Sequence, residues 1–125
     1  MRHLALLLPI IGALLAGCAG GPMGPTPPLT SGEPAAHVTV QRSRSMLGAP
    51  ASMLFSINGR RVHALRLGQQ FSFMIDPGEH RFGYDLGFNS CSQRYLLDPG
   101  VSYVLRLTPV CQFELLRPGQ GWPAR

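Results

Sequence analysis

Glycine and proline interrupt residues 37–117 at intervals of about ten positions, and this spacing restricts the fold more than any other feature of the sequence. Between the interruptions, apolar and polar residues alternate, as they do in a strand that buries one face. A segment of about 80 residues holds one small core and leaves no room for a second. The pattern predicts an all-β fold, a small single-domain antiparallel β-sandwich of about seven to eight strands.

The strongest local signal is Asn58-Gly59, because a two-residue hairpin turn needs positive φ at both central positions. Pairing outward from this turn places Phe55 opposite Val62. Five apolar side chains then share one face, as a half-buried hairpin requires. They are Met53, Phe55, Ile57, Val62 and Ala64.

Two Asp-Pro-Gly sequences, at residues 76–78 and 98–100, separate the later strands. The first predicts a hairpin with Phe73 opposite Phe82, and the second predicts a hairpin with a one-residue bulge at Gly100. Pro-Gly suits a type II turn, whose twist matches a tight hairpin poorly, so a longer connection or a crossing between sheets stays open for the first. The two aspartate side chains are expected to bond their own backbone.

The first 17 residues have the features of an export signal. Arg2 supplies a positive charge near the start, and an almost wholly apolar run follows from Leu4 to Leu15. A helix of about a dozen residues spans about 18 Å, which is too short for a bilayer core of about 30 Å. Residues 1–17 are therefore predicted to be a signal peptide and not a membrane span.

The sequence Leu15-Ala16-Gly17-Cys18 resembles the lipobox of bacterial lipoproteins. The resemblance implies that Cys18 receives a diacylglycerol, that the chain is cut before it, and that its new amine is often acylated too, for example with palmitate. Several acyl chains give a durable anchor where one does not. In that family a residue other than aspartate after the cysteine usually directs the protein to the outer membrane, so the resemblance implies, through Ala19, an outer-membrane location facing the periplasm. The alternative is an ordinary secretory signal, cut nearby, that leaves Cys18 as a free thiol.

Residues 18–36 combine this cysteine with a run rich in proline and glycine that lacks apolar periodicity. Such chains favour extended conformations of about 3.1 Å per residue, so the segment is expected to be a tether that holds the domain up to about 50 Å from the bilayer. Its Pro-Thr-Pro-Pro group is alternatively a recognition ligand. The tail, residues 118–125, is expected to be flexible.

The cysteine count agrees with an exported protein. If Cys18 is lipidated, Cys91 and Cys111 remain, and an oxidising periplasm would join them in one disulfide. A loop of about 20 residues closed in this way contributes about 3 kcal/mol. Free buried thiols are one alternative. The other is catalysis by Cys91 with His63 or His80 as its base, which needs a lowered thiol pKa.

A second resemblance covers most of residues 37–116. The sequences INGRRV, IDPGEH and LDPGVSYVLRL, with strands between them, resemble the PEGA-like β-sandwich domains and related small bacterial lipoproteins. The resemblance implies a small β-sandwich displayed at the cell envelope. It implies no catalytic residues.

The formal net charge is +5, and every basic residue apart from histidine is arginine. Two local doublets, Arg42 with Arg44 and Arg60 with Arg61, are candidates for contact with lipid phosphate, lipopolysaccharide or an acidic glycan. The default interpretation is a solvated surface. No nucleic-acid partner is expected, because the chain lacks a binding signature of aromatic and basic residues.

Metal and catalytic motifs are absent from the sequence. His37, His63 and His80 lie too far apart for common metal-ligand spacings, and we expect no metal and no cofactor. The chain has no G-x-S-x-G elbow and no paired carboxylates. The irregular segment 83–93 is the first place to look for a site.

Two classes of function remain. The first is a lipid-anchored, non-catalytic envelope module that binds a protein or glycan through a sheet edge, the arginine doublets or the tail with Trp122. The second is a small envelope enzyme that uses Cys91 or a histidine. We favour the first.

Overall fold

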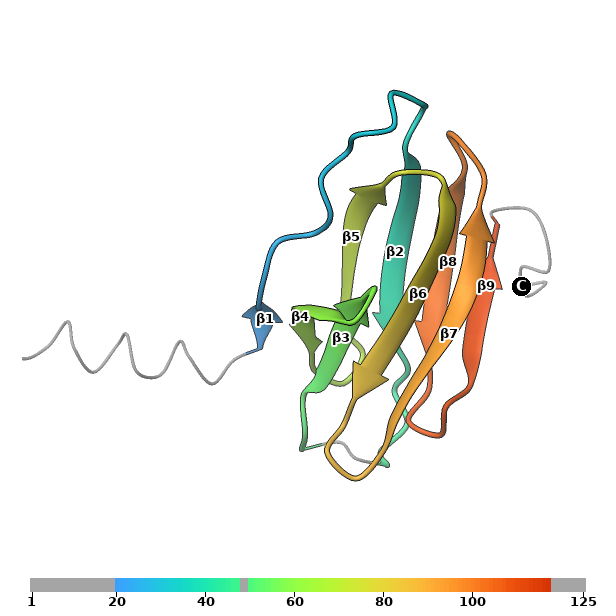
Figure 1. Ribbon diagram of the computed structural model, residues 1–125. Helices are drawn as coiled ribbons and strands as arrows, with labels where there is room; N and C mark the ends of the chain where they lie inside the picture. The colour runs from blue at the N-terminus through green and yellow to red at the C-terminus, as the bar shows by residue number, and fades with distance from the viewer. Residues whose placement is uncertain (1–19, 48–49, 118–125) are drawn as a thin grey trace, which may run out of the picture.

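The computed structural model describes residues 20–47 and 50–117, which form nine strands in two sheets packed face to face (Figure 1). The strands are β1 (Gly21–Pro22), β2 (Ala36–Arg42), β3 (Met53–Ile57), β4 (Arg60–Leu65), β5 (Gln70–Ile75), β6 (Gly78–Asp85), β7 (Ser90–Leu97), β8 (Ser102–Leu107) and β9 (Phe113–Leu116). The predicted all-β sandwich is confirmed.

Within these ranges no helix is long and apolar enough to cross a bilayer. The predictions for residues 1–17, Cys18 and residues 118–125 with Trp122 concern positions outside the described residues.

One sheet has the order β1-β4-β3-β6-β7 and is called sheet A here, and the other, sheet B, has the order β5-β2-β8-β9. The expectation of a purely antiparallel sandwich is wrong at one place, because β2 and β8 are parallel, with Val38 opposite Tyr103. Parallel neighbours need a long crossover connection. Here the connection contains most of sheet A.

The hairpin at Asn58-Gly59 is present, with φ of 52° at Asn58 and 85° at Gly59. Its register differs from the prediction beyond the first pairs, since a bulge lies between Phe55 and Ser56, and Phe55 lies opposite His63 instead of Val62. The extra residue allows both Val62 and Leu65 to join the core. Ala64 is buried as predicted, although it pairs with Gly21 of β1 and does not join the main core cluster.

Both Asp-Pro-Gly turns lead from one sheet to the other, so the two predicted hairpins are wrong. After the first turn the chain passes from β5 in sheet B to β6 in sheet A, as the open alternative allowed, and after the second it passes from β7 back to β8. Phe73 and Phe82 still meet, but across the core, with ring centroids 6.0 Å apart. The aspartate side chains bond other segments and not, as predicted, their own backbone: Asp76 binds Thr30 and Ser31, and Asp98 forms an ion pair with Arg117.

The core lies between the sheets and centres on aromatic rings. Phe55 of β3 is fully buried, and its ring centroid lies 5.6 Å from that of Phe71 and 5.9 Å from that of Phe82. These rings come from both sheets, so they fix the distance between the two layers.

Residues 20–35, called the strap below, lie along the side of the sandwich where β4 and β5 end the two sheets (Figure 1). Composition predicted an extended tether here, but the described part is bound to the domain. β1 pairs with β4, the N–H of Thr30 donates to Asp76 Oδ2 at 2.9 Å, and the N–H of Gly100 donates to the carbonyl of Pro34 at 3.1 Å. The strap therefore covers an open side of the sandwich and leads directly into β2.

Candidate binding surface

Arg42 was a candidate for the binding surface, and the structure excludes it. Its side chain is 3% exposed, and its Nη1 donates to the carbonyls of Ala51 at 2.6 Å and Leu65 at 2.8 Å. Burial lowers the pKa of Arg42, and these carbonyls compensate part of the lost hydration. Arg42 thus closes one end of the sandwich, while Arg44 at the same end is exposed.

The second predicted doublet is split between two surfaces. Successive residues of a strand point to opposite faces. Arg60 lies beside the strap, near Pro25 and Pro28, whereas Arg61 lies on the outer face of sheet A. There Arg61 forms an ion pair with Asp85 at 3.0 Å.

The outer face of sheet A collects further arginines from two consecutive strands, β6 and β7. Arg81 of β6 lies directly opposite Arg94 of β7 in the antiparallel ladder. Arg94 lies 3.6 Å from Glu79, with both side chains mostly exposed, whereas Arg81 forms no ion pair within the described residues. We call Arg61, Arg81 and Arg94 the arginine face. Like charges directly opposite one another destabilise a sheet, so the pair of Arg81 and Arg94 lowers the stability of the fold.

Shallow hollows lie over the arginine face. One, of about 290 Å³, is lined by Asn58, His80, Arg81, Arg94 and Glu79. Its neighbour, of about 340 Å³, is lined by Ser56 and Ser92 among others. Gly83 lies between these two serines in the sheet, and a Cβ there would come within 2.8 Å of the backbone oxygen of Cys91. Only glycine fits that position, because the clashing atom belongs to the backbone. Donors from neighbouring strands thus surround a surface with room for a polar ligand.

Sequence reasoning missed Arg81 and Arg94 because it searched for neighbours along the chain. The pair arises from the register of β6 and β7, which aligns residues 81 and 94. Alternation along β6 places Glu79, Arg81, Gly83 and Asp85 on one face, and the sequence shows this once β6 is assigned as a strand. The sequence does not show which strand pairs with β6.

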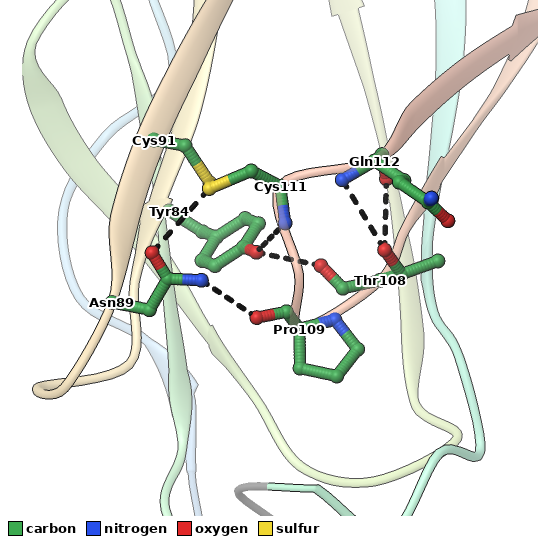
Figure 2. The surroundings of a disulfide bond; sticks show 7 residues. All are labelled: Tyr84, Asn89, Cys91, Thr108, Pro109, Cys111 and Gln112. Carbon is green, nitrogen blue, oxygen red and sulfur yellow. Dashed lines mark hydrogen bonds between the residues drawn. A yellow bond between two sulfur atoms is a disulfide. The ribbon is translucent and has the colours of Figure 1, made fainter.

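Cys91 and Cys111 form a disulfide, in agreement with the predicted pairing, with their Cα atoms 5.8 Å apart (Figure 2). It joins β7 at the edge of sheet A to the β8–β9 connection of sheet B. Beside it, the Tyr84 hydroxyl donates to the carbonyl of Thr108 at 2.6 Å and accepts the N–H of Cys111 at 2.9 Å. Asn89 Nδ2 donates to the carbonyl of Pro109 at 2.7 Å. These bonds make the segment 83–93 a junction between the sheets.

The candidate histidines have structural partners. His80 Nε2 lies 2.7 Å from the carbonyl of Asp76 and Nδ1 lies 3.1 Å from Asn58 Nδ2, so Nε2–H donates to the carbonyl and Nδ1 accepts the hydrogen bond of the Asn58 amide. The imidazole of His63 stacks on Phe71, with centroids 4.1 Å apart, and burial lowers the pKa of His63. His37 pairs with Met74 and Ser102 in the middle of sheet B. The described residues hold no group of three or more possible metal ligands.

No protein-family model matches this sequence, and no curated protein is significantly similar to it.

Proposed function

We propose that this protein is a lipid-anchored, non-catalytic binding module of the bacterial envelope, attached through Cys18, that binds an acidic glycan on its arginine face. The observation that carries the binding role is the opposition of Arg81 and Arg94. Their mutual repulsion lowers stability, and an anion placed between them would remove it. Guanidinium groups bind phosphate and carboxylate oxygens through paired N–H donors.

Two features favour binding over catalysis. A nucleophilic cysteine acts as a free thiolate, and Cys91 is held in a disulfide. Both ring nitrogens of His80 are hydrogen-bonded within the domain. The disulfide also agrees with an oxidising compartment such as the periplasm.

The test measures binding of the purified protein to two acidic envelope polymers, phosphate-bearing lipopolysaccharide and carboxylate-bearing peptidoglycan fragments. Arg81→Gln and Arg94→Gln should each lower the affinity about tenfold, the loss expected for one charge-assisted contact. Arg106→Gln, on sheet B, removes the same charge and serves as the control. Binding of one polymer alone identifies the anionic group that the face selects.

Stability gives a second readout. Because the pair is repulsive, Arg81→Gln should raise the melting temperature while it weakens binding. If neither polymer binds, or if the control loses as much affinity as Arg81→Gln, the arginine face is not the binding site.

A further inference from the structure

The anchored end of the chain lies at a defined corner of the domain. A Cβ built on Gly20 would lie 3.2 Å from Arg66 Cγ and 3.2 Å from the carbonyl oxygen of Ala64, so Gly20 sits beside the end of β4. Only Ala19 lies between Cys18 and Gly20, and the two steps from Cα to Cα reach at most about 7 Å. A lipid on Cys18 would therefore hold this corner at the bilayer and not tens of ångströms away.

Two exposed arginines flank that corner. Arg66 opens the turn that leads to Gln69, whose carbonyl accepts the N–H of Arg42. The Arg44 side chain covers the same turn, because a Cβ built on Gly68 would lie 3.4 Å from Arg44 Cγ. Within the described residues neither Arg44 nor Arg66 has a carboxylate partner. Both guanidinium groups are thus available to phosphate.

Exposed apolar side chains follow at the same end. Met46 and Leu47, in the β2–β3 connection, are 75% and 52% exposed. Phe88 and Val110 are 63% and 51% exposed, on the β6–β7 and β8–β9 connections, which the bond between Asn89 and Pro109 joins. These connections all lie at the lower end of the sandwich in Figure 1. Arginine beside large exposed apolar groups is the composition of surfaces that enter the headgroup region of a bilayer.

The opposite end differs in charge. Three of the six acidic residues of the chain gather there, because the strap and the two Asp-Pro-Gly turns meet at that end. They are Glu33, Asp76 and Asp98. An anionic lipid surface would attract the arginine end and repel the acidic one.

We propose that the end of the sandwich formed by Arg44, Met46, Leu47, Arg66, Phe88 and Val110, the membrane end, lies against the phosphate-bearing surface of the membrane that holds the Cys18 lipid. The arginines contact lipid phosphates, and the apolar side chains enter the boundary between headgroups and acyl chains. This orientation rests on the proposed lipid anchor. It leaves the outer face of sheet A pointing sideways, open to a glycan.

The test uses tryptophan fluorescence from the purified lipidated protein in vesicles of phosphatidylethanolamine and phosphatidylglycerol with brominated acyl chains, which quench nearby indoles. Met46→Trp probes the membrane end. Leu96→Trp probes the far end at a residue of matched exposure, 73%. Both variants carry Trp122→Phe, which removes the native tryptophan.

Most of the emission of the Met46→Trp protein should be lost in brominated vesicles, and the emission of the Leu96→Trp protein should be unchanged. Adding Arg44→Gln and Arg66→Gln to Met46→Trp should restore much of the signal, whereas adding Arg106→Gln should not. Equal emission from the two probes would overturn the orientation.

Mass spectrometry of the same samples separates the two proposals. Lipid found on Cys18, together with an unquenched Met46→Trp protein, overturns the membrane end alone. Absence of lipid from Cys18 overturns the proposed anchor, and with it the orientation.

Discussion

Asp76 Oδ2 accepts a hydrogen bond from the backbone N–H of Thr30, 46 residues earlier in the chain, at 2.9 Å. The same carboxylate accepts the hydroxyl of Ser31 at 3.0 Å. These bonds favour the ionised form, and the N–H of Thr30 contributes most to lowering the pKa of Asp76. The carboxylate at this turn therefore fastens the strap to the domain.

Replacing Asp76 should loosen the strap. In Asp76→Asn the charge that strengthens three hydrogen bonds is gone, so amide hydrogen exchange at Thr30 and Ser31 should accelerate. Asp98→Asn, which breaks a bond to Arg117 at the neighbouring turn, should leave that exchange unchanged. In the wild type, the folded pKa of Asp76 lies below the unfolded value of about 3.9, so these bonds are present at neutral pH and weaken as the pH falls through the folded pKa. Equal exchange in the Asp76→Asn and wild-type proteins would contradict this role.

Two tyrosines provide a matched pair for measuring a buried hydroxyl. Tyr84 bonds Thr108 and Cys111, whereas the buried hydroxyl of Tyr95 has no partner among the described residues. Burial raises the pKa of both groups. Tyr84→Phe should lower the free energy of unfolding by about 1 kcal/mol, because it removes the hydrogen-bond partner of two part-buried backbone groups. Tyr95→Phe should leave the free energy of unfolding unchanged or raise it. Urea denaturation measures both variants, and a large loss of stability in Tyr95→Phe would reveal a hydrogen-bond partner of Tyr95.

The disulfide should contribute measurably to stability. Its cysteines are 20 residues apart, so replacing both by serine should lower the free energy of unfolding by about 3 kcal/mol, measured in guanidinium chloride. The unreduced native protein should not react with iodoacetamide at Cys91. Rapid labelling there would contradict the disulfide and revive the catalytic alternative.

His63 should make stability depend on pH. Burial lowers its folded pKa, so between that value and the unfolded value of about 6.5 the unfolded chain binds more protons. Stability is therefore complete above about pH 6.5 and falls as the pH decreases through this window. His63→Phe keeps an aromatic ring against Phe71 and should make stability less dependent on pH. Melting temperatures measured at several pH values will show this. His63→Gln should flatten it as well, and an unchanged slope in both variants would assign the dependence to another group.

The sequence was sufficient to predict features that depend only on neighbouring residues. Asn58-Gly59 specified its turn because the backbone there needs positive φ at two adjacent positions. The bulge between Phe55 and Ser56 was not predictable, since it depends on how Leu65 packs against the opposite sheet. The Asp-Pro-Gly turns were identified as turns, but a turn motif does not encode which sheet the next strand joins.

The strap and the binding surface depend on distant partners. Proline-rich composition shows that residues 20–35 form no regular core element, but their docking depends on Asp76 and Gly100. Arg42 has the same charge as Arg44, yet only the packing around Ala51 and Leu65 decides that it is buried. Contacts between distant parts of the chain, and not residue type, decide whether the strap docks and which arginine is buried.

The parallel pairing of β2 with β8 determines when the domain can fold. β2 is flanked by β5 and β8, and Val38 of β2 pairs with Tyr103 of β8. A chain delivered from its N-terminus, by a ribosome or through an export channel, cannot complete sheet B until nearly its whole length has emerged. Such distant contacts slow folding. Sheet B, and with it the core between the two sheets, therefore stays incomplete for most of the delivery of the chain.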